Sequence, residues 1–385
     1  MRVLVRDLKA HVGQEVELLG FLHWRRDLGR IQFLLLRDRS GVVQVVTGGL
    51  KLPLPESALR VRGLVVENAK APGGLEVQAK EVEVLSPALE PTPVEIPKEE
   101  WRANPDTLLE YRYVTLRGEK ARAPLKVQAA LVRGFRRYLD RQDFTEIFTP
   151  KVVRAGAEGG SGLFGVDYFE KRAYLAQSPQ LYKQMALCGD LQRVFEIGPV
   201  FRAENSNTNR HLCEFTGLDL EMEFKNHYFE VLDLIGELLV FMFKQISVRY
   251  ARELGVINDQ YPFEEFKCAD PVFKMNFREG VKLLKEAGYE QDEFSDLSTE
   301  TEKALGKIVR EKYDTDFYML YGYPVSARPF YTMLDPKDPR FTNSYDFFMR
   351  GEEITSGAQR IHDPILLEQR AIECGLDVST IKDYI

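Results

Sequence analysis

The first 85 residues alternate between short apolar runs and turn-forming residues. The runs are separated by Gly, Asp and Pro, and they cover residues 16–24, 31–38, 41–46, 59–67 and 75–85. Short strands at this regular spacing, bounded by turn residues, are typical of a small β-barrel or sandwich. We therefore predict an all-β N-terminal domain over residues 1–86.

Residues 87–106 are rich in Pro and charged residues and fit neither a helical nor a strand period, so we interpret them as a linker. After it, residues 124–144 have helical spacing and residues 144–150 a strand-like pattern that stops at Pro150. The remaining expected elements are strands at 172–179, 192–202 and 216–224, a helix at 227–254, a helical insertion near 276–312, and strands in 344–361.

Strands joined mostly by hairpins, with helices gathered beside them, predict an α+β domain over residues 107–385. The total of 385 residues, 44% of them apolar, is enough for two or three domains with sizeable cores. The net charge of −7 is not that of a typical nucleic-acid-binding protein, but a whole-chain charge can hide a basic patch. Residues 1–50 are in fact net basic, with eight Lys/Arg against five Asp/Glu.

The four cysteines stand far apart, with no CxxC pair and no histidine at ligand spacing. This spacing favours neither a zinc site nor a disulfide framework, and it indicates a reducing compartment. Charges interrupt the first 20 residues, and no apolar stretch approaches the length of a membrane span. We therefore predict a cytoplasmic location and no membrane partner.

Residues 201–215, FRAENSNTNRHLCEF, join two of the predicted strands, which indicates a long antiparallel hairpin. Arg202, Arg210, His211 and Phe215 lie in or beside its loop. Guanidinium groups suit phosphate oxygens, and an aromatic face can stack on a base, so the hairpin could grip a nucleotide. The alternative is a solvated hairpin whose charges keep a sheet edge soluble. This segment alone leaves both interpretations open.

Four segments resemble, in family order, the aspartyl-tRNA synthetases of class II. FTEIFTP at 144–150 is similar to motif 1, and residues 201–215 are similar to motif 2. QSPQLYKQ at 177–184 resembles the segment that holds aspartate, and YDFFMRGEEITSGAQRIH at 345–362 resembles the active-site strands that follow. Residues 25–46 also resemble part of the OB-fold anticodon-binding domain of these enzymes.

The resemblance implies an enzyme that activates L-aspartate with ATP and passes it to the 3′ end of tRNA-Asp. Motif 1, ending at Pro150, implies a homodimer. The implied aspartate-binding residues are Glu158, Gln180, Lys183, Asp219 and Arg360. The implied ATP-binding residues are Arg202, Glu204, Arg210, His211, Phe215 and Glu353. Arg202 would also be catalytic, because it would bridge the α-phosphate and the aspartate carboxylate. The Gly-rich segment 156–165 resembles a flap over the amino acid, although an ordinary mobile loop would have the same composition.

The resemblance further implies Asp346 and Glu353 as Mg²⁺ ligands, because hard cations take carboxylate oxygens and bridge phosphates. In a regular strand, a separation of seven residues would put the two acids on opposite faces. We therefore expect a bulge or turn near Gly351 that restores a common face. The alternative is a pair of solvent-facing acids.

Specificity for aspartate is expected to rest on Lys183 and Arg360. A side-chain carboxylate can pair with both cations, whereas asparagine would leave them desolvated without a counter-charge. A lysine substrate would bring a third positive charge and is excluded for the opposite reason.

On the barrel, the resemblance implies that Phe33 stacks on an anticodon base, with Arg26 and Gln44 beside it. Phe33 could instead be a core residue, since it alternates with apolar neighbours. His23 and Pro72 resemble positions of family members that accept both tRNA-Asp and tRNA-Asn, so charging of tRNA-Asn is a second hypothesis.

No segment after Arg360 resembles motif 3, the Gly-rich strand and helix that supply an arginine for the γ-phosphate in this family. We therefore keep a catalytically impaired, tRNA-binding synthetase-like protein as the alternative function. A third class, an ATP-dependent amidating enzyme on the same fold, is disfavoured by the N-terminal barrel.

Overall fold

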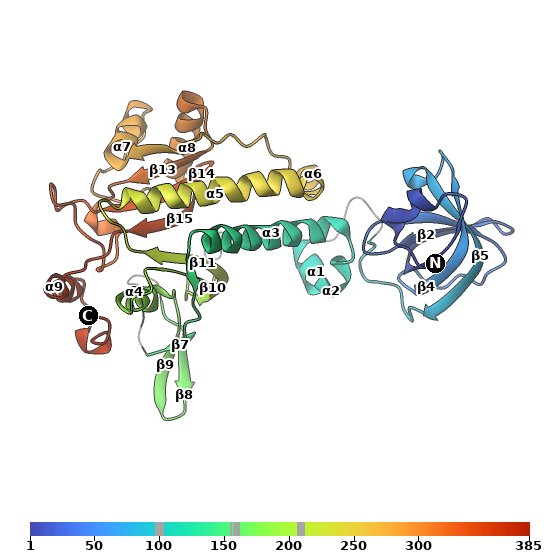
Figure 1. Ribbon diagram of the computed structural model, residues 1–385, viewed down its shortest axis with the longest axis horizontal. Coiled ribbons are helices and arrows are strands. Elements are labelled where there is room, and N and C mark those ends of the chain that lie inside the picture. Colours follow the sequence, from blue (N-terminus) through green and yellow to red (C-terminus); the bar gives the residue numbers. More distant parts are fainter. Residues whose placement is uncertain (97–103, 155, 157–161, 206–211) are drawn as a thin grey trace. The chain divides into compact units, whose positions relative to one another are not determined.

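The computed structural model describes residues 1–96, 104–154, 156, 162–205 and 212–385 (Figure 1). Residues Met1–Leu125 form one compact unit and Lys126–Ile385 a second. The division falls inside helix α3 (Glu119–Arg141), which runs from one unit into the other. Both units mix helices and strands as the α+β prediction expects, and the first contains the predicted all-β domain.

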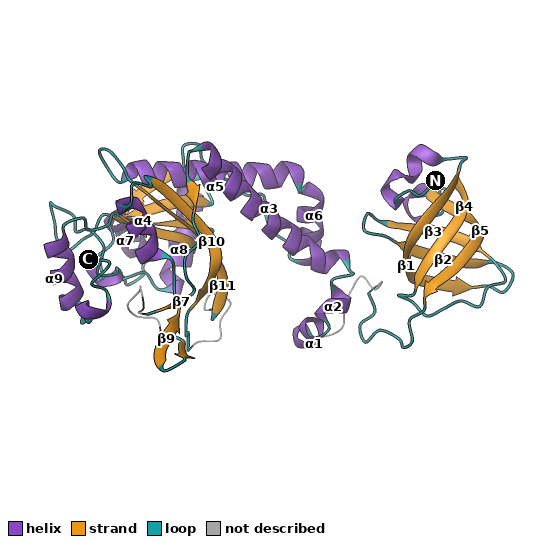
Figure 2. Cartoon of the chain, turned by 60° about the horizontal axis from the view of Figure 1, so that its bottom comes forward, coloured by secondary structure: helices purple, strands orange, loops and turns teal. Residues whose placement is uncertain are grey.

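The N-terminal barrel is closed by five strands in the order β1-β2-β3-β5-β4 (Figure 2). The strands are β1 (Glu15–Asp27), β2 (Gln32–Arg37), β3 (Val42–Thr47), β4 (Ala58–Glu67) and β5 (Leu75–Ser86). Two short 3-10 helices, η1 (Val5–His11) and η2 (Pro72–Gly74), precede β1 and β5. Each strand contains one of the five apolar runs, so the predicted barrel is confirmed.

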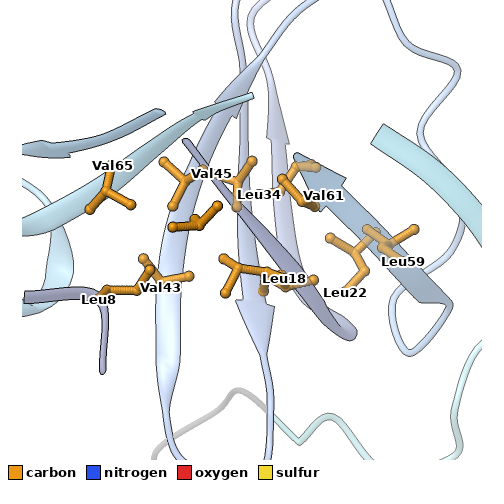
Figure 3. Close-up of a cluster of buried hydrophobic side chains, with 12 residues drawn as sticks. Leu8, Leu18, Leu22, Leu34, Val43, Val45, Leu59, Val61 and Val65 are labelled. Atoms are coloured by element: carbon orange, nitrogen blue, oxygen red, sulfur yellow. The ribbon is translucent and has the colours of Figure 1, made fainter. Parts of the chain in front are cut away.

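Alternate residues of these strands point inward and form the barrel core (Figure 3). Leu34 and Leu36 of β2 and Val43 and Val45 of β3 are almost completely buried. Because side chains alternate along a strand, the residues between them face outward. Truncating one such leucine to alanine costs about 2–5 kcal/mol of stability, so these positions are committed to packing. A ligand can therefore meet only the outward-facing residues between them.

One end of the barrel is held by a buried carboxylate, Glu56. Arg37 donates to both of its oxygens at 2.8 and 2.7 Å, and Arg117 donates at 2.9 Å. Burial alone would raise the pKa of Glu56, but the nearby His23 imidazole, together with the hydrogen bonds and charges of the arginines, lowers it to about 2. His23 Nδ1 also lies 2.8 Å from Arg37 Nη1, so the imidazole is part of this cluster.

We expect Glu56 to make the stability of this unit depend on acid pH. Its pKa falls from 4.5 to about 2 on folding, so its contribution is complete above about pH 4.5 and is lost as the pH falls toward 2. The shift corresponds to about 3 kcal/mol. Urea unfolding of Glu56→Gln and the parent protein should therefore give free energies that differ near pH 7 and converge near pH 2. Glu81→Gln, which removes an exposed partner of Arg62, is the control and should leave the pH profile unchanged.

After β5 ends at Ser86, the next elements are α1 (Pro105–Glu110) and α2 (Arg112–Thr115). The Asn104 side chain caps α1 by accepting a hydrogen bond from the backbone N–H of Thr107 at 2.8 Å. The predicted linker, 87–106, thus lies between the last barrel strand and the first turn of α1, but the first compact unit continues to Leu125. The exact domain limits stay a prediction.

The second unit contains two small sheets near its N-terminal part. The first has the order β11-β10-β6, with β6 (Thr145–Glu146), β10 (Arg193–Phe201) and β11 (Glu214–Met222). The second has the order β7-β9-β8, with β7 (Val152–Val153), β8 (Gly165–Tyr168) and β9 (Lys171–Leu175). β10 and β11 pair antiparallel along nine residues each, which confirms the predicted hairpin. The strand expected at 144–150 is only two residues long.

A four-stranded sheet, β12-β13-β14-β15, forms the rest of the second unit. Its strands are β12 (Phe273–Asn276), β13 (Phe317–Tyr321), β14 (Ser344–Met349) and β15 (Glu352–Ala358). Helix α5 (Phe229–Arg249) packs on Phe317 and Phe347 of one face. The helices α7 (Phe277–Glu286) and α8 (Thr299–Tyr313) pack on Tyr318 and Phe348 of the other (Figure 1). The predicted helices at 276–312 are therefore confirmed as cover for one sheet face.

The remaining elements are α4 (Gln180–Cys188), α6 (Ala251–Gln260), α9 (Pro364–Glu373), η3 (Val325–Ala327) and η4 (Val378–Thr380). The single helix expected at 227–254 is divided into α5 and α6 at Tyr250. Within the described part of the chain, no helix has the length and apolar character needed to cross a membrane.

Candidate functional site

The β10–β11 hairpin brings Arg202 next to Phe215. Arg202 follows the last residue of β10, and its backbone N–H donates to the carbonyl of Cys213 at 3.0 Å. Its guanidinium carbon lies 5.5 Å from the centre of the Phe215 ring, a cation–π distance. Glu204 is half-buried in the same turn, and its N–H donates to the Arg202 carbonyl at 2.8 Å. A cation beside a half-exposed aromatic face is an arrangement that suits a nucleotide.

Three of the predicted aspartate-binding residues contact one carboxylate, Glu221, and a fourth, Asp219, is joined to them through Lys183. Lys183 Nζ lies 3.0 Å from Asp219 Oδ1 and 3.5 Å from Glu221 Oε2. Arg360 Nε donates to Glu221 Oε1 at 2.9 Å. Gln180 completes the group, because its amide donates to Glu221 at 3.2 Å and its oxygen accepts from Arg360 at 2.8 Å. The two predicted specificity cations therefore face the same small region.

Local geometry explains why these side chains converge. Gln180 and Lys183 are three residues apart on α4, so they lie on the same helix face. Asp219 and Glu221 are two residues apart on β11, so they point to the same side of the strand. α4 thus presents an amide and an ammonium to the two acids of β11.

Arg360 reaches this group from a different part of the chain. It forms an isolated β-bridge with Thr332, just beyond the end of β15, and its guanidinium carbon lies 5.1 Å from the Tyr331 ring centre. Burial alone would lower the pKa of the Arg360 guanidinium, but the charge and hydrogen bonds of Glu221 outweigh it and raise the pKa. Arg360 therefore stays charged, held in one orientation.

Glu221 is the site residue that the sequence analysis missed. Burial alone would raise its pKa, but Arg360 and Lys183 reverse the effect and lower it, so Glu221 is an anion. The signal that could have found it is the alternation of acids in GLDLEMEF, where Glu221 follows Asp219 by two residues. An acid in that register must share the face of Asp219.

This anion changes the physical argument for choosing aspartate. Asparagine would not leave Lys183 and Arg360 without counter-charges, since Asp219 and Glu221 already supply them. The remaining basis for discrimination is hydrogen-bond polarity. Lys and Arg side chains only donate, so they match both oxygens of a carboxylate but oppose the N–H₂ of an amide.

Asp346 and Glu353 lie on adjoining strands of the β14–β15 hairpin. Phe347 pairs with Thr355 and Phe348 with Glu353, so Ile354 is an extra residue. This bulge places Glu353 opposite Phe348, on the face that Asp346 shares. The expectation of a common face is confirmed, with the bulge at Ile354 and the tight turn at Gly351, where φ is 75°.

The environments of the two acids differ. The Asp346 side chain is only 4% exposed, whereas Glu353 is open to solvent, so the alternative of two solvent-facing acids is wrong for Asp346. The negative charge of Asp346, with partial loss of hydration, raises the pKa of Glu353 to about 8. Glu302 of α8 and Asp296 add to this shift. A cation between these acids would be favoured because it would offset their repulsion.

The donor set suits a cation that brings most of its own ligands. No group of three or more His, Cys, Asp or Glu side chains that could hold a metal occurs among the described residues. Mg²⁺ typically keeps several waters and uses one or two carboxylates together with phosphates of the substrate. Oδ1 of Asp346 is buried and has no hydrogen-bond partner among the described residues, so it could accept such an ion.

The three predicted anticodon residues share one outer face of the barrel. Arg26 pairs with Phe33, and Gln44 pairs with Leu35, two residues further along β2. Phe33 is half-buried and alternates with the buried Leu34, so the alternative that it belongs to the core is wrong. The sequence analysis missed Trp24, which pairs with Leu35 on the same face and is 42% exposed. Its place in the alternating run of β1 was the available signal.

The other predicted positions fall into two groups. Glu158, Arg210 and His211 lie outside the described residues, as do residues 157–161 of the Gly-rich segment. His23 is turned toward Arg37 and Glu56, and Pro72 begins η2.

Comparison with known protein families gives a match for each part of this chain. Residues 104–385 match the family described as tRNA synthetases class II (D, K and N). Residues 16–85 match the OB-fold nucleic acid binding domain. The two matches cover the second compact unit and the barrel.

Individual relatives agree with this match. The chain is 65% identical to the Aspartate–tRNA(Asp/Asn) ligase of Thermus thermophilus, over all of this chain and 89% of the relative. An aspartyl tRNA synthetase structure from Entamoeba histolytica superposes with a TM-score of 0.90 at 36% identity, over 100% of this chain and 83% of that one. The asparaginyl-tRNA synthetase of Pyrococcus horikoshii with asparaginyl-adenylate gives 0.88 at 31% identity, over 100% and 89%. The chain therefore belongs to the class II tRNA synthetases of the D, K and N group.

Proposed function

We propose that this protein is an aspartate–tRNA ligase, which joins L-aspartate to ATP as aspartyl-adenylate and transfers the aspartyl group to tRNA. The observation that carries the proposal is the convergence of Lys183 and Arg360 on one carboxylate beside Asp219. Two fixed donor groups at that place suit a second carboxylate, that of the substrate side chain. The relative at 65% identity, named for both tRNA-Asp and tRNA-Asn, supports the same substrate class.

The reaction needs positioning and charge neutralisation rather than a protein nucleophile. The α-carboxylate oxygen of aspartate attacks the α-phosphorus of ATP, and the bond to pyrophosphate breaks. A ribose hydroxyl of the tRNA 3′ end then attacks the aspartyl carbonyl carbon, and AMP leaves. Arg202 would neutralise charge on the α-phosphate, while Phe215 would stack on adenine.

Mg²⁺ is a further part of the proposal, with Asp346 and Glu353 as the residues that would hold it. When bound, it would supply positive charge against the phosphates of ATP. The acid pair and the unpartnered Oδ1 of Asp346 support this assignment.

The barrel face with Arg26, Phe33, Gln44 and Trp24 is the proposed anticodon-binding surface. Exposed aromatic and polar side chains on an OB-fold read unpaired bases by stacking and by hydrogen bonds to base edges. We propose tRNA-Asp as its partner and tRNA-Asn as a second one.

Aspartate-dependent exchange of pyrophosphate into ATP tests the activity directly. We expect exchange with aspartate and none above background with asparagine. Tight tRNA binding without exchange would instead support the impaired, tRNA-binding alternative. Charging of purified tRNA-Asp and tRNA-Asn then decides the second hypothesis, because strict preference for tRNA-Asp removes it.

A homodimer through the segment before Pro150 is the proposed assembly, and Phe148, 83% exposed in that segment, supports a surface that becomes covered. Sedimentation equilibrium should give twice the chain mass of 44.3 kDa, and a single-chain mass would contradict it. A cytoplasmic location stays a prediction from the sequence.

A further inference from the structure

Arg328 makes a close contact with the acid pair of the β14–β15 hairpin. It follows η3, and its side chain is only 10% exposed. Nη2 donates to Oδ2 of Asp346 at 2.7 Å, and the guanidinium carbon lies 3.9 Å from the centre of the Tyr323 ring. The plane of the guanidinium is thus supported on one side by an aromatic ring while one of its nitrogens holds a carboxylate oxygen.

Only one oxygen of the Asp346 carboxylate is occupied by this contact. Oδ1 is buried and receives no hydrogen bond from any described residue. A buried carboxylate oxygen without a partner is costly, so a native protein retains one where a ligand completes it. Because Arg328 holds Oδ2, the carboxylate is oriented and Oδ1 is left for another partner.

The charge balance also indicates that the ion pair of Arg328 and Asp346 is not purely structural. Asp296, Asp346 and Glu353 lie within electrostatic range of one another, and Arg328 acts on all three. Because one guanidinium faces three acids, ionisation of more than one of them leaves negative charge that a cation would offset. Backbone packing holds α8 against the hairpin, since Gly306 of α8 and Gly351 of the hairpin are so close that a Cβ on Gly306 would lie 2.5 Å from the Gly351 Cα.

We propose that Arg328 is a positioning residue for the nucleotide-bound divalent cation. It holds Asp346 by one oxygen and thereby directs the other, with Glu353, toward the ion. The inference rests on the proposed ATP-dependent function, and it concerns cation binding rather than aminoacylation. Groups that orient metal ligands in this way typically change metal affinity by about 10- to 100-fold when removed.

Binding of Mn²⁺, measured by electron paramagnetic resonance with a non-hydrolysable ATP analogue, tests this inference without turnover. Arg328→Met should weaken Mn²⁺ binding about 10-fold or more, and Arg328→Lys, which keeps the charge but loses the planar fork, should weaken it less. Arg278→Met is the matched control, because Arg278 also lies over an aromatic ring, that of Phe341 at 4.0 Å, and also pairs with an aspartate, Asp338, at 3.3 Å. It should bind Mn²⁺ as the parent protein does.

Circular dichroism and thermal unfolding without Mn²⁺ establish which variants are folded. A folded Arg328→Met protein with parental Mn²⁺ affinity would overturn the inference, and so would an equal loss in Arg278→Met. If Arg328→Met does not fold, the comparison of Arg328→Lys with Arg278→Met decides in the same way. Because the titration contains no aspartate or tRNA, its result is independent of whether the parent protein shows aspartate-dependent exchange.

Discussion

Replacing Lys183 with methionine should lower kcat/KM for aspartate in pyrophosphate exchange by about 10²- to 10³-fold. The Lys183 side chain is 4% exposed and lies between Asp219 and Glu221. Without it, two acids face one guanidinium, so a substrate carboxylate would enter a region of net negative charge. Breaking a buried ion pair from one side costs about 3–5 kcal/mol, and the lower part of that range corresponds to this magnitude. Steady-state exchange at varied aspartate and at varied ATP measures the effect, and KM for ATP should change little.

Lys151→Met provides a matched control for this variant. Lys151 also pairs with a buried acid of the second unit, Glu196, at 2.7 Å. We expect it to lower thermal stability without a comparable change in KM for aspartate. An unchanged kcat/KM in a folded Lys183→Met protein would contradict the assignment of the aspartate pocket.

The pocket shows where sequence reasoning was sufficient and where it was not. Gln180, Lys183 and Arg360 could be found because each lies in a segment that resembles a family motif, and Asp219 was implied by the same resemblance. Glu221 was missed, since the motif points to residues proposed to bind the substrate, whereas Glu221 contacts those residues. Its effect is to hold both cations in place before substrate arrives, which is a form of preorganisation.

The β14–β15 hairpin illustrates a second limit. The spacing of Asp346 and Glu353 indicated that some irregularity must bring them to one face, and a bulge does so. The sequence could not locate the extra residue at Ile354, because the position of a bulge depends on cross-strand register. That register is fixed by packing of Phe347 and Phe348 on opposite faces of the sheet.

Barrel strands were predictable because alternation of apolar and polar residues is a local property. Contacts between positions far apart in the sequence could not be predicted in this way. Arg328 and Asp346 are 18 residues apart, and Arg37, Glu56 and Arg117 come from three different segments. No pattern of spacing identifies such partners, since each pairing depends on how whole elements pack.

Substituting Arg202 with methionine should reduce kcat of pyrophosphate exchange by about 10²- to 10³-fold and leave KM for aspartate nearly unchanged. Arg202 is held at the end of β10 by its backbone bond to Cys213 and by its position over Phe215, so it can meet negative charge as it develops on the α-phosphate. Arg193→Met is the matched control, because Arg193 begins the same strand and also lies over a phenylalanine, at 5.7 Å. Its kcat should stay within about twofold of the parent value, since it touches no proposed substrate group. Equal losses in the two variants would mean that β10 needs its arginines for folding and that Arg202 has no special part in the chemistry.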